Sequence, residues 1–184
     1  EVPFGGDSDL SRKALMTRNN VELANDLGNL AHRTLSLVAR NCGGIVPAQG
    51  ARTEEDAKLL GQVSLLPDLL ALQLDRCALT DALEEVWKVI RACNAYIDHQ
   101  APWALRKTDP ARMADVLRVL LDALRGIATL LQPFMPRSMA QMLDQLGVAE
   151  GERVFAALSQ PLPAGRQLPA PQGIFPRYAD PEPV

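Results

Sequence analysis

Hydrophobic residues recur at helical spacing along most of this chain. Two stretches show the pattern over the greatest length, residues 74–100 and residues 108–131. The first stripe consists of Leu79, Leu83, Val86, Trp87, Ile90, Cys93, Asn94 and Ile97. The second stripe consists of Met113, Val116, Leu117, Leu120, Leu121, Leu124, Ile127 and Leu131. We therefore predict two long helices with one face in a common core. Trp87 is predicted to be a core residue, and Asn94 a buried amide that holds helix ends together.

Start and stop signals predict the helices of the first half. A short helix is expected over residues 11–19 and a longer one over residues 21–41, because paired glycines follow residue 42. Thr53 precedes three acidic residues, the pattern of an N-cap and a first helical turn. The helix that Thr53 opens is expected to reach residue 65, where Pro67 interrupts it, and a short second helical piece can follow.

The second half ends in a different kind of sequence. Thr108 is predicted to cap the helix over residues 108–131, with Pro110 in its first turn. From residue 161 onward the chain is rich in proline and reads as mostly extended, and no strand alternation precedes it. We predict an all-α fold, an antiparallel helical bundle over residues 1–160 with an extended proline-rich C-terminal arm over residues 161–184.

Composition limits the possible partners. The 184 residues suffice for one sizeable domain, and the net charge is −3. A protein that grips nucleic acid mainly through phosphates carries a basic excess, so any RNA contact here must come from a few placed groups. No apolar run approaches the length that crosses a membrane. We expect neither DNA nor a membrane as a partner.

Cysteine usage points to a reducing compartment. The three cysteines, Cys42, Cys77 and Cys93, are odd in number and far apart, with no Cys-x-x-Cys pair or Cys/His cluster. We therefore expect reduced thiols in the core, no metal site and a cytoplasmic location. The chain begins at Glu1 rather than a methionine. We expect it to be a piece of a longer protein.

The predicted helix over residues 21–41 has one apolar and one polar side. The polar side carries Glu22, Asn25, Asp26, Asn29, His32, Arg33, Ser36 and Arg40. Such a side is commonly just hydrated, and that interpretation stays open. Asparagine is a poor helix former, however, and Asn29 and Arg33 are one turn apart. An amide beside a guanidinium can recognise the hydrogen-bonding edge of an unpaired base.

Trp103 is the candidate aromatic partner for such a base. Aromatic residues make up only 4% of the chain, and Trp103 follows Pro102 just past the end of a predicted helix. An indole held there can stack on a flat ligand, or it can plug one end of the bundle. In the second case the protein is a helical interaction or structural module. Arg40, Arg106 and Lys107 are weaker candidates, for contacts to the RNA backbone.

Several motifs together resemble the anticodon-binding domain of methionyl-tRNA synthetase. They are FGGD at residues 4–7, RNNVELANDLGNL at 18–30 with Arg33, NAYID at 94–98, APW at 101–103, QPFMP at 132–136 and IFPR at 174–177. The order and spacing match over nearly the whole chain. The LGNL segment alone leaves other class I synthetases open, whereas the NAYID and APW pair favours the methionine enzyme.

The resemblance implies a partner and a role for each candidate residue. In that family the all-helical domain follows the catalytic domain and reads the CAU anticodon of the methionine tRNAs. Asn29 and Arg33 would hydrogen-bond anticodon bases, and Trp103 would stack on the first anticodon base. The expected partners are the anticodon loop of methionine tRNA and the catalytic domain of the parent synthetase.

The resemblance also implies what this chain lacks. Neither the HIGH-type nor the KMSKS-type signature, which bind ATP in class I synthetases, occurs in the sequence. In the family these signatures and a zinc-binding insertion lie N-terminal to this region. We therefore expect no catalytic residue and no cofactor on this chain, with ATP and zinc belonging to the catalytic part. Alone, the chain should neither activate methionine nor charge tRNA.

Overall fold

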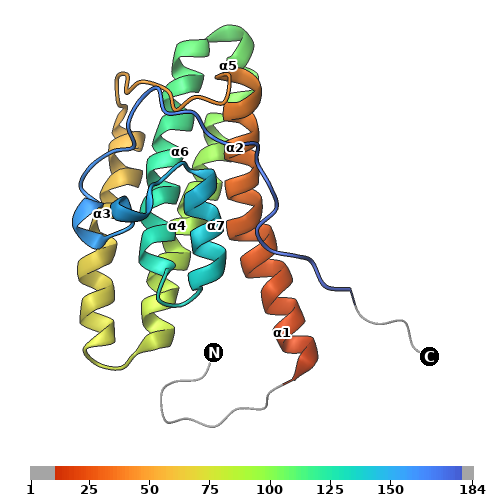
Figure 1. Ribbon diagram of the computed structural model, residues 1–184, viewed down its shortest axis with the longest axis vertical. Helices are drawn as coiled ribbons and strands as arrows, with labels where there is room; N and C mark the ends of the chain where they lie inside the picture. Colours follow the sequence, from red (N-terminus) through yellow and green to blue (C-terminus); the bar gives the residue numbers. More distant parts are fainter. Residues whose placement is uncertain (1–10, 180–184) are drawn as a thin grey trace.

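A computed structural model describes residues 11–179 as a bundle of upright helices with an extended C-terminal segment lying along it (Figure 1). The elements in order are α1 (Arg12–Arg18), η1 (Asn19–Gly28), α2 (Asn29–Asn41), α3 (Glu54–Leu74), α4 (Leu79–Gln100), α5 (Pro102–Thr108), α6 (Pro110–Leu131), α7 (Pro136–Gln145), η2 (Glu150–Glu152) and η3 (Phe155–Ala157). Within residues 11–179 there is no strand, only one isolated bridge between Ile45 and Gln167. The all-α prediction is confirmed.

Helix α6 is the centre of the bundle. It packs against α2, α3, α4, α5 and α7. All eight positions of its predicted stripe are buried, and so are residues on its other sides, including Val119, Ala123 and Leu130. A helix that is buried all round in this way can form only in the middle of a protein. Each large apolar side chain that it buries stabilises the fold by about 1.5–3 kcal/mol.

The first three elements form one uninterrupted helical rod. The predicted break near residue 20 is wrong: α1 passes directly into η1, a π-helical segment, and η1 passes into α2. Asn19 and Asn20 lie at the position of that break. Their amides instead donate to the main-chain oxygens of Pro176 (2.8 Å) and Tyr178 (2.7 Å) of the C-terminal segment. A contact with a distant part of the chain therefore explains their presence inside a helix.

Helix α3 continues past its proline. The predicted end at residue 65 is wrong, because Pro67 lies inside a helix that runs to Leu74. Leu66 and Leu70 on either side of Pro67 are buried, and α3 packs along both α4 and α6. This packing outweighs the loss of one backbone hydrogen bond at the proline. The predicted cap is confirmed: Thr53 and Asp56 form a reciprocal capping box.

Two helix starts differ from the prediction. Helix α4 begins at Leu79 rather than near residue 74, because residues 75–78 form a turn in which Cys77 has a positive φ of 55°. Cys77 is exposed in this turn, so the prediction of a core thiol is wrong there and holds only for Cys93. The cap of α6 is Asp109, whose carboxylate accepts the main-chain N–H of Arg112 at 2.9 Å. Thr108, the predicted cap, is instead the last residue of α5. Aspartate is one of the preferred N-cap residues, because its carboxylate can accept a main-chain N–H of the first helical turn.

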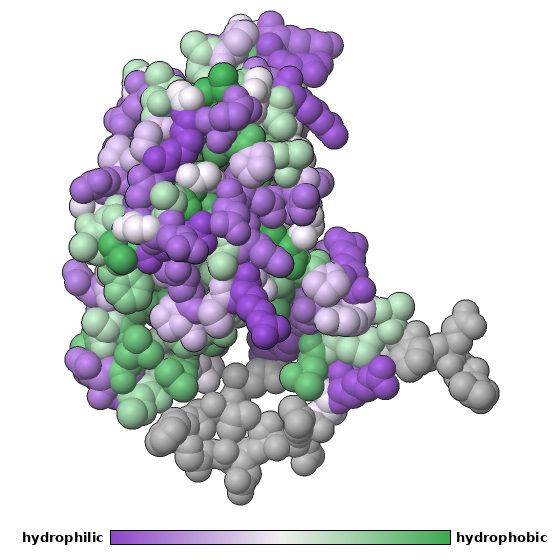
Figure 2. All heavy atoms as spheres, viewed as in Figure 1, coloured by the Kyte–Doolittle hydropathy of each residue, from purple (hydrophilic) through white to green (hydrophobic). Residues whose placement is uncertain are grey.

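The two ends of the bundle differ in polarity. Leu72, Leu74 and Leu79 are exposed around the turn between α3 and α4, where hydrophobic side chains gather in Figure 2. Helix α5 lies at the opposite end (Figure 1), which is largely hydrophilic on the face that Figure 2 shows. The C-terminal segment is anchored along the bundle by the buried side chains of Leu162, Leu168 and Ile174.

Replacement of Trp87 tests whether this residue belongs to the core. It is 8% exposed, and its Nε1 has no hydrogen-bond partner within the described residues. We expect Trp87→Ala to lower the free energy of unfolding by about 3–5 kcal/mol in urea denaturation. Trp87→Phe should cost less than half as much, because no hydrogen bond is lost with the indole. An alanine variant as stable as the parent would show that Trp87 is not a core residue.

Candidate nucleic-acid interface

Trp103 lies in the first turn of α5, at the polar end of the bundle. Because the residue before a proline avoids the right-handed helical region, α4 ends at Gln100, and Ala101 takes a left-handed conformation with φ 44° and ψ 58°. Pro102 then opens α5 and is buried. Trp103 remains 46% exposed. The prediction of Trp103 beyond a helix end is thus refined: the indole stands on a short second helix.

Arg33 and Trp103 are in contact, although α2 and α5 are far apart in sequence. The guanidinium carbon of Arg33 lies 5.3 Å from the centroid of the Trp103 ring, which is cation–π geometry. Arg33 also donates from Nη2 to Oδ1 of Asp98 at 2.6 Å, and the Asp98 side chain is 61% exposed. The arginine therefore contacts both an aromatic ring and a carboxylate. Its hydrogen bond to Asp98 uses only part of its five N–H donors.

Asp98 is a member of this site that the sequence reasoning missed. It appeared only as part of the NAYID motif, with no role of its own. Its position near the end of α4 was the available signal, because a carboxylate there is exposed and can reach an arginine on a neighbouring helix. Arg33 belongs to α2, however, and the contact between α2 and α4 can be recognised only in the folded chain.

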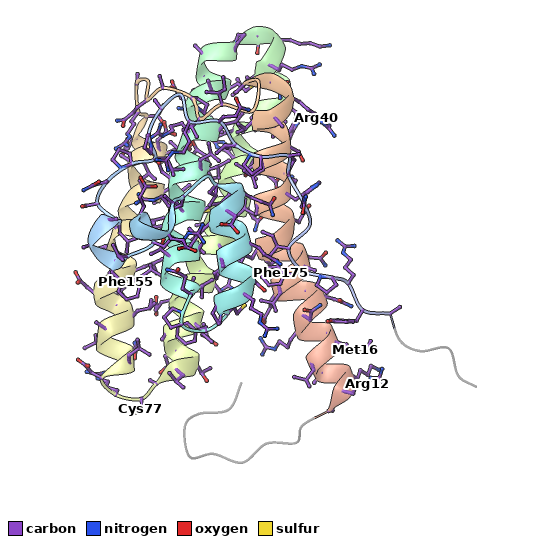
Figure 3. All side chains as sticks on the ribbon, viewed as in Figure 1. Arg12, Met16, Arg40, Cys77, Phe155 and Phe175 are labelled. Atoms are coloured by element: carbon purple, nitrogen blue, oxygen red, sulfur yellow. The ribbon has the colours of Figure 1, made fainter. Side chains whose placement is uncertain are left out.

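The other predicted residues lie on the same part of the surface. Asn29 is exposed at the first position of α2, one turn before Arg33 and so about 6 Å along the helix axis. Arg40 is exposed in the last turn of α2, at the end beside α5 (Figure 3). Arg106 and Lys107 are exposed in the last turn of α5. Three exposed basic side chains therefore lie near Trp103 in a protein whose net charge is −3.

Asn25 serves a different purpose from the one its helix face suggested. Its Oδ1 accepts a hydrogen bond from Arg177 of the C-terminal segment. Phe175 lies close to Gly28, where an added Cβ would approach the Phe175 ring to 3.2 Å and the Leu23 carbonyl oxygen to 3.0 Å. The C-terminal segment thus occupies the surface of η1. The part of the polar face that remains open begins at Asn29.

Asn94 has the structural role predicted for it, although it is half-buried rather than buried. Its amide donates to the carbonyl oxygens of Asp26 in η1 and Ile90 in its own helix, both at 3.2 Å. The Asp26 oxygen also accepts from the main-chain N–H of Asn29, so Asn94 adds a second donor to this carbonyl from outside the helix. The amide therefore ties α4 to the π-helical segment that precedes the polar face.

A buried ionic cluster lies at the same end of the bundle. Asp56 at the start of α3 is 0% exposed. Its carboxylate accepts two hydrogen bonds from Arg112 of α6 (2.5 and 2.7 Å) and one from the Tyr96 hydroxyl of α4 (2.6 Å). Arg112 also donates to Oε1 of Gln100 at 2.8 Å. Three helix ends are joined through these four side chains.

The cluster fixes the charge state of its carboxylate. Burial alone would raise the pKa of Asp56, but the hydrogen bonds from Arg112, Tyr96 and Thr53 together hold it well below its ordinary value. Burial and the hydrogen bond to Asp56 raise the pKa of the Tyr96 hydroxyl. The ion pair with Asp56 raises the pKa of Arg112. Asp56 is therefore a charged, fully paired carboxylate at neutral pH.

The described part of the chain has neither a cluster of metal-binding side chains nor a helix that could span a membrane. No group of three or more His, Cys, Asp or Glu side chains within residues 11–179 is arranged to hold a metal ion. Among the helices described, none is long and apolar enough to cross a membrane. The candidate site is thus a surface of exposed aromatic, amide and guanidinium groups.

Comparison with known proteins identifies relatives over nearly the full length. The family described as the anticodon binding domain of methionyl tRNA ligase matches residues 46–183. The methionine–tRNA ligase of Brucella suis is 47% identical over 98% of this chain. That of Mycobacterium tuberculosis is 44% identical over 100% of the chain. The chain spans 35% and 36% of the length of these two relatives, respectively.

Solved structures agree with the sequence comparisons. The free form of Mycobacterium tuberculosis methionyl-tRNA synthetase superimposes with a TM-score of 0.95 at 44% identity, over 98% of this chain and 37% of that one. The same enzyme bound to methionyl-adenylate gives a TM-score of 0.93 at 43% identity, over 95% of this chain and 35% of that one. At this identity both the fold and the family are shared.

The buried carboxylate predicts how stability depends on pH. The folded pKa of Asp56 lies below the unfolded value of about 3.9, so its contribution is complete above that value and is lost as pH falls toward the folded pKa. We expect Asp56→Asn to cost up to about 3 kcal/mol in urea unfolding at pH 7, because it leaves the partly buried Arg112 without its ion-pair partner. The difference from the parent should shrink as the pH falls below about 4.

The exposed Asp68, on the same helix, provides the matched control. Asp68→Asn should change the unfolding free energy by no more than about 0.5 kcal/mol at neutral pH. If Asp56→Asn behaved like Asp68→Asn, the ionic cluster would contribute nothing to the fold.

Proposed function

This chain belongs to the family of anticodon-binding domains of methionyl-tRNA ligases, and on that premise we propose that it reads the CAU anticodon of methionine tRNA. The observation that carries the proposal is the pairing of Arg33 with an exposed Trp103. A buried indole would support the alternative, a tryptophan that plugs the bundle in a structural or interaction module. An indole 46% exposed at the polar end favours a stacking partner from outside.

The chemistry of the surface suits an unpaired base. A base stacked on the Trp103 indole gains about 1–3 kcal/mol, whatever its identity. Identity must then be read at the base edge. Arg33 can donate to the acceptor atoms of cytosine, because its bond to Asp98 uses only part of its fork of N–H groups. Asn29 can both donate and accept, which suits the mixed edges of adenine and cytosine.

The proposed roles of the basic residues follow from their location. Arg40, Arg106 and Lys107 are exposed at the α5 end, where they can neutralise phosphates on either side of a stacked base. Phosphate contacts add affinity without sequence preference. Arg33, Asn29 and Trp103 would therefore supply selectivity, and the basic residues would supply the salt-dependent part of binding.

In the whole enzyme, we propose, this surface selects the tRNA to which methionine is attached at the expense of ATP. ATP, and zinc where it is used, would be held by the catalytic part rather than by this chain. The partners are then the anticodon loop of methionine tRNA and that catalytic part. A cytoplasmic location stays a prediction from the cysteine content.

Replacement of Arg33 is the direct test of base reading. We expect Arg33→Ala to weaken binding of an RNA stem-loop with a CAU anticodon at least about tenfold, because charged hydrogen bonds to the base are lost. Binding of a stem-loop with the triplet scrambled should change little. The free energy of unfolding should fall by only about 0.5–1 kcal/mol, the size of the cation–π contact that is lost. Filter binding and urea denaturation give the two measurements.

Arg76 supplies the matched control. It is exposed at the α3–α4 turn, the end of the bundle remote from α5. Arg76→Ala removes the same charge, so it should leave the preference for CAU unchanged. The proposal fails if Arg33→Ala and Arg76→Ala weaken both stem-loops equally, because charge alone would then account for binding.

The dependence of binding on salt tests the basic residues separately. For single-stranded RNA the slope of log K against log salt is about −0.7 for each phosphate neutralised. Replacement of Arg106 and Lys107 with glutamine should therefore make the slope shallower by about 1.4, with CAU and scrambled loops affected alike. An unchanged slope would remove both residues from the proposed RNA contacts.

A further inference from the structure

Helix α5 is a short element on which the proposed stacking surface depends. It runs only from Pro102 to Thr108, and Pro102 is its one buried residue. Leu105 is partly buried against the core. A helix of this length has little stability of its own in water. The orientation of Trp103 must therefore be set largely by what holds the two ends of α5.

One hydrogen bond joins the residues that flank the two ends of α5, Gln100 and Arg112. Gln100 is the last residue of α4, and Arg112 lies in the first turn of α6. Arg112 donates from Nη2 to Oε1 of Gln100 at 2.8 Å, so the two ends of residues 101–111 meet at this contact, while α5 itself packs against α6 and α2. Gln100 also donates to Oε2 of Glu55 at 2.5 Å, which fixes the other atom of its amide.

The closing contact cannot move freely, because Arg112 is itself anchored. Its guanidinium is bound in a two-pronged manner to the fully buried Asp56 carboxylate, which the Tyr96 hydroxyl also contacts. Two parallel hydrogen bonds fix the plane of a guanidinium as well as its position. The same Nη2 that reaches Gln100 is one of the two nitrogens on Asp56. Arg112 thus connects the start of α5, through Gln100, to the buried cluster around Asp56.

The last turn of α4 carries the outer contact as well. Asp98, which holds Arg33 beside Trp103, lies between Tyr96 and Gln100, which face the buried cluster. One turn of helix therefore connects the inner cluster to the outer pair. Any loosening of Gln100 would displace Asp98 and the start of α5 together.

We propose that Gln100 and Arg112 are positioning residues that hold the Trp103 stacking surface in its binding orientation, an inference that rests on the proposed function. They do not touch RNA. They fix the angle at which α5 leaves the bundle, so that a base meets Trp103 and the Arg33 guanidinium at the same time.

The test uses Trp103 as its own reporter. The chain contains two tryptophans, so Trp87→Phe leaves Trp103 as the only one. In the Trp87→Phe background, Gln100→Leu leaves a side chain of similar size but removes the oxygen that accepts the hydrogen bond from Arg112. We expect the fluorescence anisotropy of Trp103 in the free chain to fall, and binding of a CAU stem-loop to weaken about tenfold. The melting temperature should stay within about 4 °C of the background protein.

Two further variants separate positioning from general stability. Gln100→Glu combined with Glu55→Gln keeps an acceptor for Arg112 and a hydrogen bond between positions 55 and 100, so the pair should restore the anisotropy of free Trp103. Gln62→Leu makes the same substitution at an exposed site of α3 and should change neither anisotropy nor affinity.

Each outcome decides a definite point. If Gln100→Leu kept both the anisotropy and the affinity, the hydrogen bond between Arg112 and Gln100 would not position Trp103. A loss of anisotropy with unchanged affinity would show that the orientation is irrelevant to binding, which also overturns the inference. If the background protein failed to prefer CAU over a scrambled loop, the proposed function itself would fail, and that result is read before any Gln100 variant is compared.

Discussion

The buried carboxylate of Asp56 is the constraint on which the polar end of this bundle depends. A carboxylate without contact to water is strongly unfavourable unless it is fully paired, and Asp56 is paired with Arg112, Tyr96 and the cap of its own helix. Those partners come from α3, α4 and α6. Three helix ends must therefore meet at one point, whatever the rest of the bundle does. The apolar packing of α6 stabilises the fold, while the ionic cluster determines how its end is arranged.

That arrangement gives the outer surface its geometry. In the pair formed by Arg33 and Trp103 the indole is exposed and the arginine half-buried, and a cation–π contact near the surface is worth only about 0.5–1 kcal/mol. It could not by itself hold α2 and α5 in register. Asp98 adds a second weak contact at the surface. The strong interactions lie beneath, so the surface groups can exchange their contacts for those of a ligand without disturbing the fold.

The sequence predicted the features that depend on local pattern. The stripe of α6, the capping box at Thr53 and the end of α4 at Gln100 all follow from spacing, caps and proline chemistry. Features that depend on distant contacts were missed. Asp56 looked like an ordinary acidic residue of a first turn, and Pro67 like a helix end. That Arg33 and Trp103 lie close together was implied only by the family resemblance, and the contact of Arg33 with Asp98 on α4 was not predicted, because neither helix reveals its neighbour.

The central claim is that Trp103 is the surface on which an anticodon base stacks. The most direct test is a titration of tryptophan emission at low salt, with CAU and scrambled stem-loops added to the native chain and to Trp103→Phe. The account predicts quenching by the CAU loop alone, and its loss in Trp103→Phe while the fold persists. Equal quenching by both loops, or quenching that survives in Trp103→Phe, would contradict it.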